Sequence, residues 1–122
     1  MGLDMYLTGE IFFTRRWRRG QRKAELYDLG YWRKHPNLHG YIVQTFAGGD
    51  DSCQQIHLSA DDLRKIIAAV KAKDLPHTTG FFFGESDGTE WREDVSIFTN
   101  AVDWLTTEEP NQWRSVYYQA SW

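Results

Sequence analysis

The first segment of this sequence alternates between apolar and other side chains at every second residue, which is typical of a β-strand with one buried face. The apolar side of residues 3–13 consists of Leu3, Met5, Leu7, Ile11 and Phe13, and the other side of Asp4, Tyr6, Thr8, Glu10 and Phe12. Gly9 interrupts the apolar side, which indicates a bulge or a close approach of neighbouring backbone. This segment therefore predicts one strand of a sheet that covers a core.

Two further segments alternate in the same way. In residues 24–33, one side carries Tyr27, Leu29 and Tyr31 and the other Leu26, Gly30 and Trp32. A basic stretch with a glycine separates this segment from the first, so residues 3–33 are predicted to form a long hairpin with a basic tip. Residues 114–122 alternate again, so the chain is expected to end in a strand of the same sheet.

Three segments have helical spacing instead. Pro36 and Asn37 can open a first helix that Gly48-Gly49 ends. Ser59 is a strong N-cap candidate for a second helix over about 59–73, whose apolar stripe is Leu63, Ile66, Ile67 and Val70. A third apolar stripe predicts a helix over about 90–106. Cys53–Leu58 is expected to form a short strand or an extended piece, and the glycine-flanked run 80–84 a buried strand.

These elements follow one another in the order β-β-α-β-α-β-α-β. The 122 residues suit a single domain, 1–122. We therefore predict an α+β fold, in which a mostly antiparallel sheet of about five strands carries about three helices on one face. No apolar run approaches the ~20 residues that a membrane helix needs, so no membrane partner is expected.

Short motifs in a fixed order suggest a family. The chain opens with MGLDMYL, carries YWRK at residues 31–34 and closes with YYQASW. It resembles a family of small, functionally uncharacterised proteins of bacteriophages and prophage-bearing bacteria, over essentially its whole length. The resemblance implies an accessory role, such as modulating a host or defence protein, in the cytoplasm of the bacterial host. It supplies no catalytic residue or cofactor, and relatives often have a longer segment where residues 15–23 are short and basic.

Charge is unevenly distributed along the chain. Residues 1–35 carry eight basic and four acidic residues, whereas residues 36–122 carry six basic and thirteen acidic residues. This argues against a uniformly basic nucleic-acid binder and leaves one local basic patch. That patch either is a solvated hairpin end or contacts phosphates while Trp17 stacks on a base. Its candidate contacts are Arg15, Arg16, Trp17, Arg18, Arg19, Arg22 and Lys23.

The YWRK stretch gives the first candidate surface for a ligand or partner. An arginine beside a tryptophan can stack on a ring as well as bind a carboxylate or phosphate. The alternative is that Tyr31 and Trp32 anchor the sheet to the next helix while a basic neighbour pairs with an acidic residue. The candidate surface consists of Tyr31, Trp32, Arg33, Lys34, His39, Glu93 and Asp94.

Catalytic and metal-binding signatures are weak. Candidate metal ligands are His35, His39, Cys53, His57 and His77, but neither CxxC nor HExxH occurs. Cys53 with His39 is the one nucleophile–base pair to consider, against the alternative of a small buried thiol. We expect no resident metal or cofactor.

Three functions remain at this stage. The first is a non-enzymatic interaction module that binds or modulates a host or phage protein, in keeping with the many aromatic residues, 16% of the chain. The second is a small-molecule binder or enzyme that uses Trp32, Arg33, His39 and nearby carboxylates. The third is nucleic-acid binding through the basic tip. The sequence does not indicate an oligomeric state.

Overall fold

The computed structural model describes residues 2–14, 18–73, 75 and 91–122. Along the chain run β1 (Asp4–Phe13), β2 (Ala24–Arg33), α1 (Pro36–Phe46), β3 (Ile56–Leu58), α2 (Ala60–Lys71), α3 (Trp91–Thr106) and β4 (Gln112–Ser121). The predicted strand at 80–84 lies outside the described residues.

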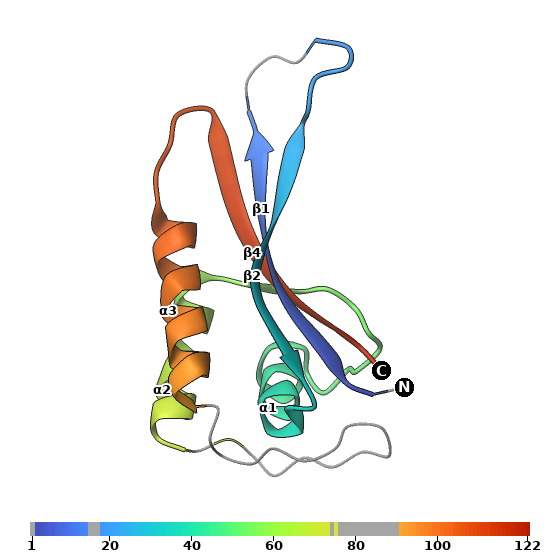
Figure 1. The fold of residues 1–122 in the computed structure, drawn as a ribbon, viewed down its shortest axis with the longest axis vertical. Coiled ribbons are helices and arrows are strands. Elements are labelled where there is room, and N and C mark those ends of the chain that lie inside the picture. The colour runs from blue at the N-terminus through green and yellow to red at the C-terminus, as the bar shows by residue number, and fades with distance from the viewer. Residues whose placement is uncertain (1, 15–17, 74, 76–90) are drawn as a thin grey trace.

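The described strands form one antiparallel sheet in the order β2-β1-β4-β3. The α+β prediction is confirmed, with four described strands where about five were expected. The strand expected at Cys53–Leu58 is shorter, because Cys53 has a positive φ of 58° that an extended strand does not allow. The β1–β2 hairpin projects beyond the helices, and α3 runs alongside β4 (Figure 1).

The alternating side chains of β1 point to opposite faces of the sheet, as predicted. Its apolar side is buried, and the residues between have intermediate or high exposure. The buried side joins a core that includes Leu38 and Ile42 of α1, Leu63 and Ile66 of α2, and Phe98 of α3. The helices therefore cover one face of the sheet, and no described helix covers the opposite face, which we call the open face.

A bulge in β2 changes the predicted side-chain pattern. Leu7 lies opposite Gly30 and Thr8 opposite Asp28, so Leu29 is an extra residue in the ladder. An extra residue moves every side chain beyond it to the other face. Tyr27 therefore contacts Trp104 of α3 on the helical side, whereas Tyr31 lies on the open face. The sequence pattern had put both tyrosines on one side.

Gly9 allows α3 to pack closely against the sheet. A Cβ atom at Gly9 would lie 2.6 Å from Cη2 of Trp104, closer than non-bonded carbons approach. The expected close approach at this glycine is thus present, although it is made by a side chain of α3.

The helix ends agree with the sequence signals. Ser59 accepts a hydrogen bond from the Asp62 amide, and the Asp62 carboxylate accepts one from the Ser59 amide, which completes a capping box. Such a cap typically stabilises a helix by ~1 kcal/mol. Pro36 occupies the first turn of α1, as expected, and His35 is at the N-cap position. The buried polar residues are His35, His39 of α1 and Asp94 of α3 among those described.

Candidate functional site

A buried carboxylate connects α3 to the end of β2 and the start of α1. Asp94 is 1% exposed. Its Oδ1 accepts a hydrogen bond from Nε1 of Trp32 at 2.7 Å, and its Oδ2 lies 2.7 Å from Nε2 of His35. The Trp32 ring also stacks on Phe98 at a centroid distance of 5.3 Å. Three elements thus meet at one side chain.

This cluster has the features of a structural joint. Trp32 and His35 are 6% and 4% exposed, so a substrate cannot reach the carboxylate without displacing the core. A buried carboxylate is tolerated where donors satisfy both of its oxygens, as the indole and imidazole do here. We therefore assign Trp32 and Asp94 to scaffolding, which was the alternative expected for Trp32. Asp94 pairs with Trp32 and His35 rather than with Arg33 or Lys34.

A second polar chain connects α1 to the end of β4. Nδ1 of His39 lies 2.6 Å from the Tyr118 hydroxyl, and its Nε2 lies 3.0 Å from Oδ2 of Asp51. Oδ1 of Asp51 accepts a hydrogen bond from Nε1 of Trp122 at 3.2 Å. The contacts are satisfied if Tyr118 donates to Nδ1 and the protonated Nε2 donates to Asp51. The chain thus fixes the C-terminal strand to the first helix.

The arrangement resembles a catalytic relay, but its burial argues against catalysis. Burial raises the pKa of the Tyr118 hydroxyl well above 10, with smaller contributions from Asp51 and Cys53. A phenol with so high a pKa keeps its proton and is a poor nucleophile. His39 is 2% exposed and is already bonded through both ring nitrogens. We therefore interpret this chain as structural.

The remaining residues of the predicted YWRK surface do not share a face with Trp32. Tyr31 lies on the open face, where its hydroxyl donates to Oδ1 of Asp4 at 2.6 Å. Arg33 and Lys34 are exposed, as is Glu93 on the first turn of α3. The structure brings Trp32 and Asp94 together and separates them from the exposed members of the predicted group.

The other candidates for chemistry are also dispersed. Cys53 is partly exposed, and its carbonyl accepts a hydrogen bond from the Gln119 side chain. The ring nitrogens of His39 contact Tyr118 and Asp51. Within the described ranges, no three His, Cys, Asp or Glu residues are grouped as a metal site would require. His77 lies outside these ranges.

The open face of the sheet carries most of the exposed large apolar side chains. Among the described residues, the only such side chain away from this face is Trp122. The members on the face are Tyr6, Phe12, Leu26, Tyr31 and Trp113. Exposed apolar groups gathered on one surface typically mark an interaction site. Sequence reasoning placed Tyr6 and Phe12 on the polar side of their strand, and that unusual position was the available signal.

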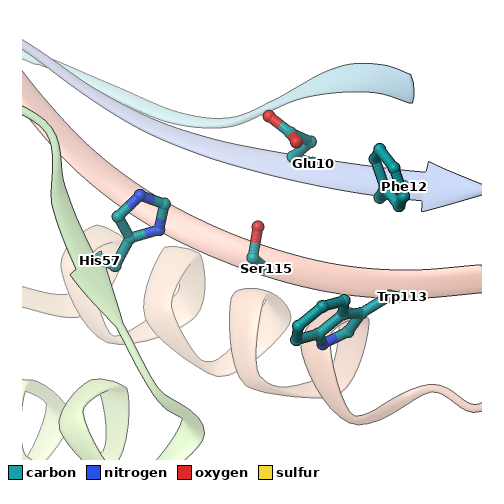
Figure 2. A pocket seen from close by; sticks show the side chains of 5 residues that line it. All are labelled: Glu10, Phe12, His57, Trp113 and Ser115. Carbon is teal, nitrogen blue, oxygen red and sulfur yellow. The ribbon is translucent and has the colours of Figure 1, made fainter. Parts of the chain in front are cut away.

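This face contains a hollow where three strands lie side by side. Glu10 and Phe12 come from β1, Trp113 and Ser115 from β4, and His57 from β3 (Figure 2). The hollow has a volume of about 400 Å³. Trp113 is 71% exposed. The lining combines aromatic rings with one carboxylate, and the sequence did not single out any of these residues except His57.

The basic tip lies at the far end of the hairpin. Arg18, Arg19, Arg22 and Lys23 are exposed there, whereas Arg15, Arg16 and Trp17 lie outside the described residues. Arg22 pairs with Glu25 at 3.3 Å. An exposed pair of this kind contributes little to stability. Arg18 and Arg19 are exposed to solvent, as a contact with phosphates would require.

Comparison with known proteins gives little information about identity. No protein-family model matches the chain, and no solved structure matches it. A curated protein of Oryza sativa subsp. japonica, the chloroplastic GTP diphosphokinase CRSH2, is 33% identical over 64 residues. The match covers 52% of this chain and only 11% of that protein. Within the described segments, every helix is too short or too polar to cross a bilayer.

Proposed function

We propose that this protein is a non-enzymatic binding module that holds a segment of a partner protein against the open face of its sheet. The observation that carries the proposal is the concentration of exposed aromatic and aliphatic side chains on that face. Leu26 and Trp113 are 64% and 71% exposed there. Tyrosine and tryptophan are the residue types most enriched at the energetic centres of protein interfaces.

The charge of the face favours a protein over a nucleic acid. Along β1, β2 and β4 it carries the carboxylates Asp4, Glu10 and Asp28 against one arginine, Arg33, and β3 adds His57. A phosphate backbone would be repelled by such a surface, whereas a segment with lysine or arginine would be attracted. The partner is therefore a protein with basic residues in its binding segment.

An unpaired length of strand edge supports the same conclusion. β3 pairs only with Val116–Tyr118, so Gln112–Ser115 of β4 has β1 on one side and no described strand on the other. The backbone amides and carbonyls of such an edge can form ladder hydrogen bonds with an extended polypeptide. A nucleic acid cannot complete that ladder.

The same charges disfavour a second copy of this chain as the occupant. Two copies packed face to face would bring Asp4, Glu10 and Asp28 of one copy near those of the other. Like charges in contact at an interface are destabilising. The phage resemblance supports a setting in which the partner is a host or phage protein in the bacterial cytoplasm, and this setting is part of the proposal.

The test compares three immobilised proteins in a bacterial lysate: the natural chain, the double variant Leu26→Thr/Trp113→Thr, and the control Trp122→Thr. Threonine suits a strand, and both sites of the double variant are highly exposed, so the fold is expected to persist. Trp122 is an exposed aromatic away from the open face, which makes it a matched control. Recovered proteins are identified by mass spectrometry, purified and titrated against each variant.

We expect the double variant to bind the purified partner at least about tenfold more weakly, because truncating two anchors costs more than ~1.4 kcal/mol. The control is expected to bind within about twofold of the natural chain. Equal binding by the double variant would overturn the proposal. The proposal would also be overturned if the immobilised chain recovered no protein, or if nuclease treatment of the lysate abolished the recovery. It would be overturned as well if the chain bound only other copies of itself.

A further inference from the structure

The hollow on the open face combines the two features that bind an organic cation. Glu10 lines it together with the aromatic residues Phe12 and Trp113 (Figure 2). Aromatic faces attract ammonium and guanidinium groups, and a carboxylate adds charge-assisted hydrogen bonds. We propose that the hollow binds one lysine or arginine side chain of the partner. The inference rests on the proposed function and names the group that the surface recognises.

Glu10 is the residue on which the recognition depends. Glu10 lies on β1, between Ser115 on the neighbouring strand β4 and Leu26 on the neighbouring strand β2. Neither neighbour carries a positive charge. Among the described residues, no ion pair or side-chain hydrogen bond engages its carboxylate. A cation from outside would therefore meet a carboxylate that the described chain does not neutralise.

The shape of the hollow suits a long, partly apolar side chain. About 400 Å³ is at the lower end of the range for small-ligand sites, which is ample for one basic side chain. Lysine and arginine have aliphatic stems that can lie against the Trp113 indole while the charged end approaches Glu10. The Glu10 carboxylate would repel an anionic group. A purely apolar group would leave the charge of Glu10 without a partner.

The open edge of β4 explains how a partner could present that side chain. A segment paired with Gln112–Ser115 would direct every second side chain to the open face, beside Trp113 and Ser115. One basic residue at such a position would reach the hollow. The charge of the hollow and the unpaired edge thus favour the same occupant, an extended segment with a basic residue.

The experiment titrates the whole chain with defined probes and records amide and indole NMR shifts. The probes are the N-acetyl methylamides of arginine, lysine and norleucine, the last being a neutral analogue of the lysine stem. The variants are Glu10→Gln, which keeps the size of the side chain, and the control Glu93→Gln. Glu93 is an exposed carboxylate on α3 that does not line this hollow, so it tests whether total charge matters.

We expect saturable shifts of the Trp113 indole and of the Glu10 and Ser115 amides with the two cationic probes. Binding of the neutral probe should be at least about fivefold weaker, in line with cation–π and ion-pair contributions at partly exposed sites. Glu10→Gln should weaken the cationic probes about fivefold, whereas Glu93→Gln should change their affinity less than twofold. Equal binding of all three probes, shifts elsewhere, or no saturable shifts would overturn the inference.

The two proposals fail in different ways. If the Leu26→Thr/Trp113→Thr variant no longer binds the partner but Glu10→Gln still does, the open face is the binding surface and the proposed cation site is wrong. If the cationic probes bind at Glu10 but no protein is recovered, the proposed function fails while the site remains.

Discussion

Replacing Asp94 by alanine is expected to destabilise the protein severely. The substitution removes the acceptor of both the Trp32 indole and the His35 imidazole, each of which is buried. Each buried donor left without a partner costs about 1–3 kcal/mol, and the substitution leaves two of them. We expect Asp94→Ala to lower the free energy of unfolding by about 2–6 kcal/mol. Urea unfolding followed by tryptophan fluorescence measures this.

Two further variants make the prediction specific. Asp103→Ala removes an exposed carboxylate from the same helix and should change the free energy of unfolding by less than ~0.5 kcal/mol. Asp94→Asn keeps one acceptor oxygen, so it should be less harmful than alanine and remain measurable if the alanine variant does not fold. If Asp94→Ala lies within ~1 kcal/mol of the natural chain, the buried cluster does not join these elements as argued.

Three other outcomes follow from the structure. Gly9→Ala should destabilise the fold by about 1–3 kcal/mol in urea unfolding, because the new methyl group would clash with Trp104. Burial raises the pKa of Tyr118 well above 10, so its stabilising contribution is complete below pH 10 and lost as pH rises above 10. Tyr118→Phe should therefore reduce the alkaline loss of stability by up to about 1.4 kcal/mol per pH unit, measured by unfolding at several alkaline pH values. If the basic tip contacts nucleic acid, Arg18→Ser/Arg22→Ser should weaken a salt-dependent gel shift; absence of any shift at low salt would end that hypothesis.

The sequence predicted the fold well because its elements have strong local signals. The alternation of residues 3–13 and the apolar stripes of the helices recur in the structure, as does the Ser59 cap. The bulge at Leu29 was not predictable from alternation alone. It depends on the pairing with β1, and one extra residue reverses the faces of Tyr27 and Tyr31.

The sites were less predictable because they are built from distant residues. Trp32 and Asp94 are 62 positions apart, and their hydrogen bond depends on how α3 packs on the sheet. The candidate surface predicted from the sequence included the adjacent residues Tyr31 and Trp32. Adjacent side chains of a strand point to opposite faces of the sheet, so these two residues cannot share one surface. Glu10 and Trp113 meet at the hollow only through the β1–β4 register.

Site-specific photocrosslinking in bacterial cells tests the central claim, that the open face is the binding surface. A photoreactive phenylalanine analogue replaces Tyr6 on that face or, as a control, the exposed Lys65 on α2. We predict a discrete protein crosslink from position 6 and none from position 65. Crosslinks to protein from position 65 alone, or none from position 6, would contradict the claim.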